Sequence, residues 1–166
     1  MRLTLAVLAV AAALPALADI EASFREGAPT DLLTIANIGG CALGPAEVVF
    51  DLTGSAGGLI LDTAAMGPGT SSYRPVTILG GAAHLAEPPR TADGDRRLVL
   101  RLTDLPPGAA VDIALDLDDT RGTVRTRVSG EEMIGARLTV TTENGPNEGT
   151  FGADGRARAP GAFCGV

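Results

Sequence analysis

Lysine and tryptophan are missing from the chain, and tyrosine and histidine each occur once in its 166 residues. All 13 basic residues are arginines, and they stand against 20 acidic residues, for a net charge of −7. This acidic balance argues against a nucleic-acid-binding protein, which needs a basic surface to neutralise phosphates. It argues equally against docking on an anionic membrane surface. The scarcity of histidine and aromatic residues leaves few side chains for acid–base catalysis near neutral pH or for stacking on bases.

The amino-terminal segment is typical of a secretory signal peptide. A positive start at Arg2 is followed by an apolar run over residues 3–14 and by a small-x-small motif ending at Ala18. The run is shorter than the roughly 20 apolar residues of a transmembrane helix. We therefore predict a signal peptide over residues 1–18, one domain over residues 19–166, no membrane span, and export to the periplasm, the cell surface or the medium.

Only two cysteines are present, Cys41 and Cys164, and both follow the predicted leader. An even number of cysteines in an oxidising compartment indicates a disulfide, which would stabilise the fold by about 4–5 kcal/mol in the chain-entropy model. A redox or metal pair is disfavoured, because there is no CxxC motif and His84 is the only histidine. We expect the disulfide to hold a carboxy-terminal tail, residues 152–162, that would otherwise be loose.

Glycine (22 residues) and proline (11 residues) recur at short intervals, and the segments between them alternate apolar and polar residues. Alternation with a period of two is typical of strands with one buried face. Strands are predicted over residues 19–24, 31–37, 46–53, 58–63, 74–80, 96–103, 110–118, 123–129, 134–142 and 148–152. The pattern predicts an all-β fold, a single antiparallel Ig-like β-sandwich of about nine short strands.

The segments on either side of the Leu-Pro-Pro-Gly motif at residues 105–108 suggest a hairpin in a defined register. Pairing Leu100 with Ile113 stacks the apolar residues, and the same register sets Arg101 opposite Asp112 and Arg97 opposite Asp116. Continuing through the next turn places Arg125 opposite Asp116 from the other side. The hairpin would thus neutralise one face of the sheet.

A cluster of aspartates near the end of this hairpin suggests a calcium site. Asp116, Asp118 and Asp119 follow one another closely, and Asp93 and Asp95 lie in a loop that could converge on the same edge. Carboxylate oxygens are the ligands that calcium requires, although no EF-hand spacing is present. The structural alternative is that the strand aspartates pair with arginines while Asp118 and Asp119 shape a turn.

Signals for catalysis are weak. The Gly-Ser-Ala-Gly-Gly segment at residues 54–58 lacks the glycine at position 53 that a Gly-x-Ser-x-Gly nucleophile motif would need, and it favours a turn. It also lacks the Lys-Ser/Thr ending of a phosphate-binding loop. A serine triad would have to use His84, and no nucleophile is marked near it. We therefore predict no catalytic residues and a protein that is not an enzyme.

Several segments resemble a known family. They are TIANIGGC at residues 34–41, VFDLTGSAGGLILDT at 49–63, LPPG at 105–108 and DLDDT at 116–120. They are similar to small exported alphaproteobacterial proteins of the "aggregation factor core" type, over roughly residues 20–160. The resemblance implies a β-sandwich with a role in adhesion or assembly at the cell surface, and it implies no catalytic residues.

Two hypotheses about function follow. The first is an exported, non-enzymatic binding or adhesion module whose partner is a protein or an envelope glycan, reached through an edge strand or the loops at one end. The second is a small-ligand or calcium-dependent pocket, possibly hydrolytic, that uses the loop carboxylates. Convergent carboxylates in a cleft would favour the second hypothesis, and carboxylates paired with arginines on a flat sheet would favour the first.

Overall fold

The computed structural model describes residues 17–70, 72–122 and 127–163. Within these ranges the chain is nearly all β, with one short 3₁₀ helix, η1 (Ala82–His84), and no helix there is long and apolar enough to cross a membrane. The strands are β1 (Leu17–Arg25), β2 (Asp31–Asn37), β3 (Ala46–Asp51), β4 (Ile60–Leu61), β5 (Thr77–Gly80), β6 (Arg97–Leu102), β7 (Ala110–Leu115), β8 (Leu117–Asp118), β9 (Arg137–Thr142), β10 (Gly145–Thr150) and β11 (Arg156–Phe163).

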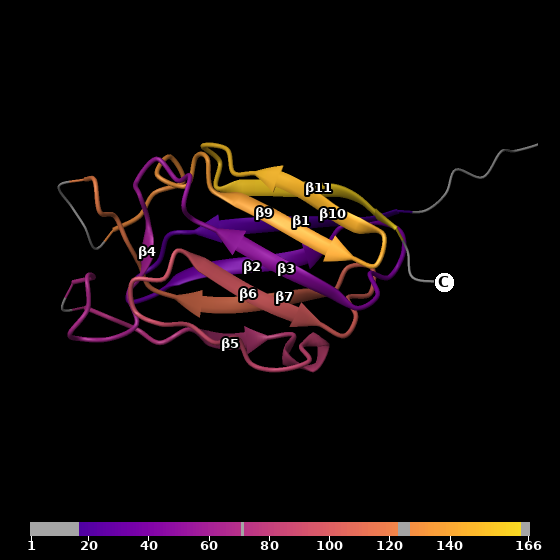
Figure 1. The fold of residues 1–166 in the computed structure, drawn as a ribbon, viewed down its shortest axis with the longest axis horizontal. Coiled ribbons are helices and arrows are strands. Elements are labelled where there is room, and N and C mark those ends of the chain that lie inside the picture. The colour runs from indigo at the N-terminus through magenta and orange to yellow at the C-terminus, as the bar shows by residue number, and fades with distance from the viewer. Residues whose placement is uncertain (1–16, 71, 123–126, 164–166) are drawn as a thin grey trace, which may run out of the picture.

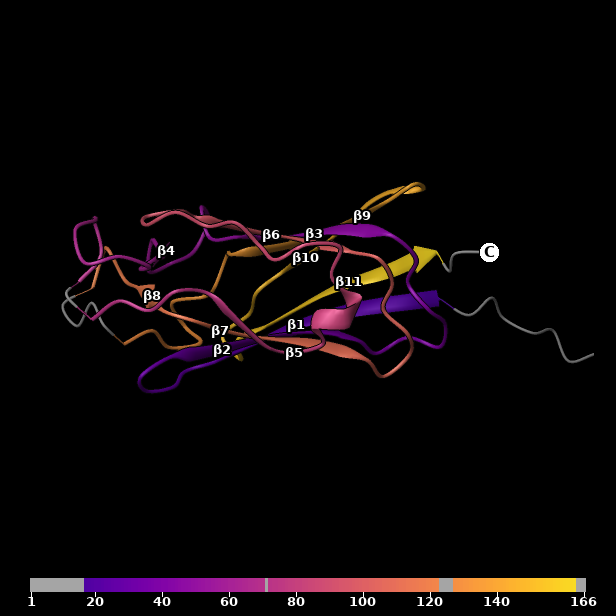
Figure 2. The ribbon, with the colours of Figure 1, turned by 90° about the horizontal axis from the view of Figure 1, so that it is seen from below.

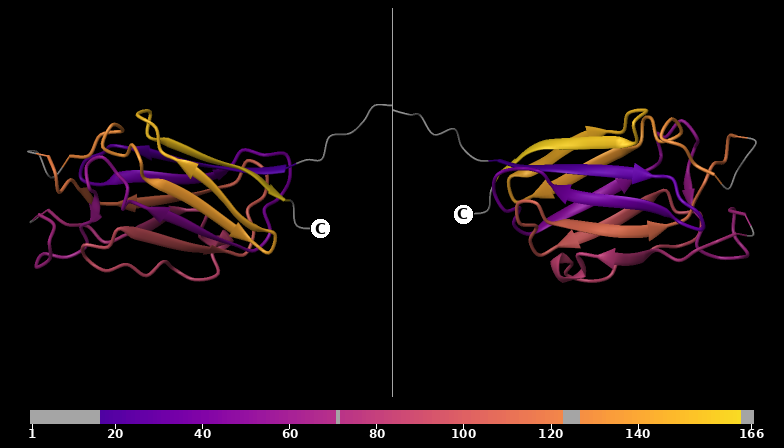
Figure 3. Two further views of the ribbon diagram at one scale, coloured as in Figure 1. Left: turned by 45° about the horizontal axis from the view of Figure 1, so that its top comes forward. Right: turned by 180° about the vertical axis from the view of Figure 1, so that it is seen from behind.

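The strands form two packed antiparallel sheets (Figure 1). One sheet has the order β11-β1-β2-β7-β5 and the other β10-β9-β3-β6, while β4 and β8 make a separate two-stranded pair at one end. Figure 2 shows the two layers edge-on, and Figure 3 shows the β3–β6–β9 face and the β1–β2–β7 face in turn. The predicted antiparallel β-sandwich is confirmed, with somewhat more strands than the sequence indicated.

Alternation of apolar residues sets which side of each strand faces the core. In β2 the side chains of Leu33 and Ile35 are buried, and their neighbours in sequence are half-buried. Between the sheets the rings of Phe50 and Phe151 meet edge to face, with centroids 5.3 Å apart, an arrangement that aromatic pairs favour. The inward-facing residues predicted for three other strands are also buried: Val48, Phe50 and Leu52; Leu98, Leu100 and Leu102; and Val111, Ile113, Leu115 and Leu117.

The predicted hairpin between residues 97–103 and 110–117 is wrong. Strand β6 pairs with β3, which sets Arg97 opposite Asp51 and Arg101 opposite Glu47, whereas β7 pairs with β2 and β5 in the other sheet. The 105–108 motif carries the chain across from one sheet to the other. The other half of the prediction, Arg125 opposite Asp116, falls on a residue outside the described ranges.

The error has a physical reason. Glu47 and Asp51 have the same spacing of four as Asp112 and Asp116, and both pairs alternate with core residues. Two arginines four residues apart can therefore be neutralised in either register, and cross-strand charge alone does not choose between them.

The prediction of a loose carboxy-terminal tail is also wrong, because most of it forms β11 along the edge of β1. Ala157 and Ala159 face the core, while Arg156 pairs with Glu21 at 2.5 Å and Arg158 pairs with Asp19. Alanine is a small apolar residue and is depleted in strands. The alternation of alanine with arginine in this segment therefore does not predict a strand.

A strand predicted over residues 123–129 is not seen in its described part, residues 127–129, and residues 123–126 lie outside the described ranges. The predicted cleavage after Ala18 stays a prediction. In the full chain β1 begins at Leu17, and its pairing with β2 begins at Ile20, so a chain starting at Asp19 retains that whole β1–β2 register.

Candidate functional site

Strands β4 and β8 lie at one end of the sandwich (Figure 2). This end also carries carboxylates from several parts of the chain. The β4–β8 pair is only two residues long and is extended by a hydrogen bond from the backbone N–H of Asp62 to the carbonyl of Asp116, at 2.9 Å. This pairing places Asp62 next to the segment that carries Asp116 and Asp118. We call Asp31, Asp62, Asp93, Asp116 and Asp118 the acidic cluster.

The loop over residues 62–76, described at residues 62–70 and 72–76, lies against this cluster and is held by its carboxylates. The backbone N–H of Thr70 donates to both Asp62 Oδ2 (3.0 Å) and Asp118 Oδ2 (2.6 Å). The N–H groups of Thr63 and Ala64 donate to Asp93 Oδ1, at 2.6 and 3.0 Å. The carboxylates therefore hold the loop near its start, at Thr63 and Ala64, and again at Thr70.

Two glycines allow this close approach. A Cβ atom at Gly69 would collide with the carboxylate of Asp62, and one at Gly67 would collide with the carboxylate of Asp93. The Gly-Pro-Gly segment is thus required where the loop backbone passes over the carboxylates, because any side chain there would displace them.

Several carboxylate oxygens of the cluster are buried without a hydrogen-bond partner. Asp62 and Asp118 are fully buried and Asp116 is 7% exposed. Within residues 17–70, 72–122 and 127–163, no hydrogen bond reaches Asp62 Oδ1, Asp118 Oδ1, Asp93 Oδ2 or Asp116 Oδ2. Native structures pair the large majority of buried polar atoms, and a buried carboxylate without a partner costs more than a neutral group. Four such atoms at one end of the molecule therefore require an explanation.

The same crowding changes the acidity of Asp62. Burial raises its pKa, the negative charge of Asp118 raises it further, and the N–H of Thr70 only partly opposes the rise, so the pKa of Asp62 is about 6. The charge of Asp93 acts in the same direction. Near pH 6 the carboxyl of Asp62 therefore exchanges between a protonated form and a charged form whose charge the surroundings do not compensate.

Asp31 and Asp116 line a neighbouring pocket of about 590 Å³, together with Glu26 and Arg127. Burial raises the pKa of Asp116 to about 7, with contributions from neighbouring carboxylates that Arg74 partly opposes. Burial also raises the pKa of Asp31 to about 6, although the N–H of Gly27 donates to it. The pocket thus contains two carboxyl groups that titrate near neutral pH.

The predicted calcium residues divide into two sets. Asp93, Asp116 and Asp118 belong to the acidic cluster, but Asp95 accepts from the N–H of Ala92 at 2.6 Å and Asp119 accepts from the N–H of Arg121 at 2.6 Å. These two shape their own turns, as the structural alternative held for Asp119. In the described part of the chain, no group of three or more His, Cys, Asp or Glu residues is arranged to hold a metal ion.

Sequence reasoning missed Asp31 and Asp62. Asp62 ends the apolar run Leu-Ile-Leu and is followed by the loop with Gly67 and Gly69. An acidic residue directly after a buried strand and before a glycine-rich loop is a signal that could have identified it. Asp31 has no comparable signal, since it stands alone at the start of β2.

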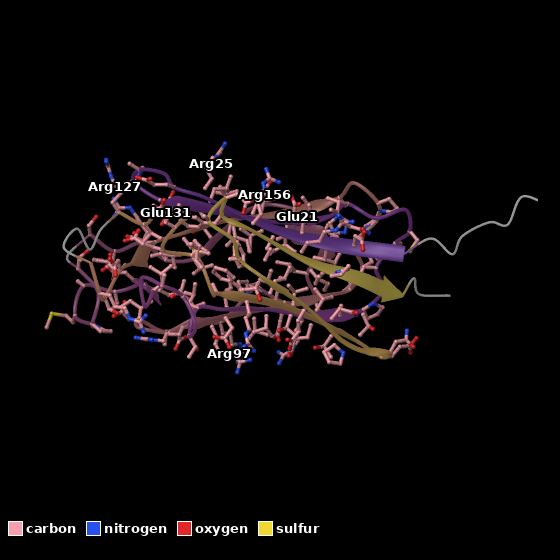
Figure 4. All side chains as sticks on the ribbon, turned by 90° about the horizontal axis from the view of Figure 1, so that it is seen from above. Glu21, Arg25, Arg97, Arg127, Glu131 and Arg156 are labelled. Carbon is pink, nitrogen blue, oxygen red and sulfur yellow. The ribbon has the colours of Figure 1, made fainter. Side chains whose placement is uncertain are left out.

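Several carboxylates on the sheet faces are paired with arginines, whereas Asp112 on β7 accepts from the Thr34 hydroxyl at 2.6 Å. Arg97 lies 3.6 Å from Asp51, and Arg101 lies 3.6 Å from Glu47. Figure 4 shows Glu21 and Arg156 side by side on one face and Arg97 on the opposite face. His84, the only histidine, contacts Asp104 at 3.1 Å. These partners leave the sheet faces close to electrically balanced.

The predicted disulfide stays a prediction, because Cys164 lies outside the described ranges. Strand β1 pairs with β2 up to Asn37 and with β11 up to Phe163. The side chain of Asn37 donates to the carbonyl of Cys41 at 2.8 Å. The chain therefore brings Cys41 and the end of β11 to the same end of the sandwich, opposite the acidic cluster.

No protein-family model, curated protein or solved structure matches the chain. Fold and site together define an antiparallel β-sandwich with a buried acidic cluster beneath one loop. Inferences about function therefore depend on the chemistry of these residues.

Proposed function

We propose that the protein is an exported, non-enzymatic β-sandwich module that binds a partner protein at the cell envelope through the loop over residues 62–76. The observation that carries this proposal is the exposure of Met66 and Tyr73 on that loop, at 96% and 38%. Two large apolar side chains exposed on one surface loop fit a loop that carries a binding site. The carboxylates of the acidic cluster anchor the loop, so these side chains are presented from a fixed base.

Three further points support a binding role. The amino-terminal segment has the pattern of a signal peptide, and the resemblance to "aggregation factor core" proteins suggests adhesion or assembly at the cell surface. The net charge of −7 favours a basic partner surface around the apolar contact. An envelope glycan is the other partner class that export would allow.

A pair of matched variants tests the proposal. We expect the M66S/Y73S double variant to reduce retention of the exported protein on envelope fractions of the producing organism at least about tenfold. The control is Leu79→Ser, which alters an equally apolar, 63% exposed residue on β5. Equal retention of wild type and M66S/Y73S would contradict the proposal. Retention that survives protease treatment of the envelope and is lost with glycosidases would indicate a glycan instead.

The pocket beside the cluster supports a second candidate, a small-ligand or hydrolytic function. Its specific observation is that Asp31 and Asp116 line one cavity and titrate near pH 6 and 7, the range that general acid–base catalysis requires. A hydrolytic activity that Asp116→Asn abolishes while the fold stays intact would favour this candidate. Absence of activity against ester, glycoside and phosphoester substrates would argue against it.

A further inference from the structure

We propose that a divalent cation of the calcium type binds between Asp62 and Asp118, beneath the loop over residues 62–76. The inference goes beyond partner binding and does not depend on it. It starts from two buried carboxylates that meet at one backbone group, the N–H of Thr70, through their Oδ2 atoms. Each of them keeps a buried Oδ1 atom that no described residue reaches by a hydrogen bond.

The negative charges at this point call for a cation, or for a proton that Asp62 shares with Asp118 through a side-chain hydrogen bond. Asp62 and Asp118 share the amide N–H of Thr70, and the Thr70 hydroxyl donates to Asp62 Oδ2 at 3.3 Å. These neutral donors do not offset the cost of burying two negative charges. The negative charge of Asp93 acts on Asp62, and that of Asp118 acts on Asp116. The ion pairs among the described residues include none of these four aspartates.

Arginines near the cluster are engaged elsewhere. Arg74 follows Tyr73 on the loop, and its guanidinium donates to the carbonyl of Tyr73 at 2.8 Å. Arg121 donates to the carbonyls of Ser55 and Ala56. The charge of Arg74 still acts on the cluster, where it lowers the pKa of Asp116.

The ligand chemistry fits a hard divalent ion. Calcium takes six to eight oxygens from carboxylates, backbone carbonyls and water, in flexible geometry. The protein would supply only two carboxylate ligands, Asp62 and Asp118, because no three acidic, histidine or cysteine residues of the described chain are arranged to hold a metal. Loop carbonyls and water would supply the remaining oxygens, so we expect weak binding, with a dissociation constant on the order of 10⁻⁴–10⁻³ M as in other extracellular modules.

Tyr73 can serve as a spectroscopic probe for an ion at this site. Tyr73 is the only tyrosine, and tryptophan is absent. It precedes Arg74, whose backbone N–H donates to the carbonyl of Asp62 at 3.1 Å. Terbium replaces calcium at oxygen sites and emits when energy is transferred from a nearby tyrosine, with an efficiency that falls steeply with distance. Tyrosine-sensitised emission therefore reports an ion at this end of the molecule.

The test uses the exported protein, first freed of metal with a chelator. Calcium is titrated by calorimetry, and terbium is titrated by tyrosine-sensitised emission followed by displacement with calcium. We expect one calcium ion per chain, terbium emission that calcium displaces, and no sensitised emission from Tyr73→Phe. Asp62→Asn and Asp118→Asn, which keep an acceptor for the Thr70 N–H, should each weaken calcium binding at least about tenfold. Asp104→Asn, which removes a half-exposed carboxylate beside His84, should bind as the wild type does.

Two results would overturn the inference: a wild-type protein that gives neither heat with calcium nor sensitised terbium emission, or wild-type affinity in both Asp62→Asn and Asp118→Asn. If an asparagine variant fails to fold, the wild-type titrations and the Tyr73→Phe blank still decide. Failure of the envelope-binding experiment leaves this result unaffected, because the cation is measured on the protein alone.

Discussion

The sheet faces and the acidic cluster carry the same kind of side chain in opposite circumstances. On the sheets, Asp51 and Glu47 face arginines across a strand pair, at positions where side chains naturally meet. At the loop end, Asp62 and Asp118 are buried, and their outer oxygens lack a hydrogen-bond partner among the described residues. On the sheets, arginines thus lie where strand pairing places them opposite acidic residues. We infer that it leaves the loop end to a cation or to protons.

The largest expected effect that distinguishes the two regions is the pH dependence of stability in the metal-free protein. The acidic cluster should give this dependence the opposite sign to that of the ion pairs on the sheet faces. The pKa values of Asp31, Asp62 and Asp116 are about 6, 6 and 7 in the native state, above the ordinary value of an unfolded aspartate. The native state therefore takes up protons before the unfolded chain does, and stability rises as pH falls from 8 to 5. We expect a gain of about 3 kcal/mol, measured by urea unfolding in chelator. A stability that is flat or higher at pH 8 would contradict it.

The next effect isolates one carboxyl of the cluster. Asp116→Asn should stabilise the metal-free protein by about 2 kcal/mol at pH 8, because it removes a buried charge whose pKa is raised. Urea unfolding at pH 8 and pH 5 measures this effect, and we expect it to shrink at pH 5, where the wild-type carboxyl is already protonated. Equal changes at both pH values would mean that charge is not the cause.

The smallest effect concerns the sheet faces and has the opposite sign. Burial raises the pKa of Asp51, but hydrogen bonds from Thr53 and the charges of Arg97 and Arg137 outweigh this effect and hold the pKa below its ordinary value. The charged Asp51 thus stabilises the protein when the pH lies above the ordinary pKa of an aspartate. This contribution is lost as the pH falls through the lowered pKa. Asp51→Asn should destabilise the protein by less than about 1 kcal/mol at pH 8, as is usual for surface ion pairs. Thermal melts at low and high salt measure it, and a stabilising effect would remove the contrast with Asp116→Asn.

Much of the fold could be predicted because alternation is a local property. The inward faces of β2, β3, β6 and β7 follow directly from the spacing of leucine, valine and isoleucine. Strand pairing is not local. Glu47 and Asp51 in β3 have the same spacing as Asp112 in β7 and Asp116 just after it, so the partner of β6 is ambiguous from the sequence. Strand β11 was missed because alanine and arginine have little preference for strands. Its position also depends on pairing with the edge of β1, which is not a local property.

The acidic cluster shows the same limit. Asp116 and Asp118 are close in sequence and could be grouped from it, whereas Asp62 joins them only through the short β4–β8 pair. Asp119 has the same sequence signal as Asp118, yet it accepts from the N–H of Arg121 in a turn. Asp119 is as buried as Asp118, so the difference is contact with the loop. Which carboxylates contact the loop over residues 62–76 depends on how that loop folds back, and no residue spacing encodes that directly.

The most direct test of the central claim is the anomalous difference density of crystals grown at neutral pH with calcium. We predict a peak between Asp62 and Asp118, in contact with the Oδ1 atoms that have no hydrogen-bond partner among the described residues. A calcium peak only at the turns of Asp95 or Asp119, or no peak and the two carboxylates sharing a proton, would contradict the account.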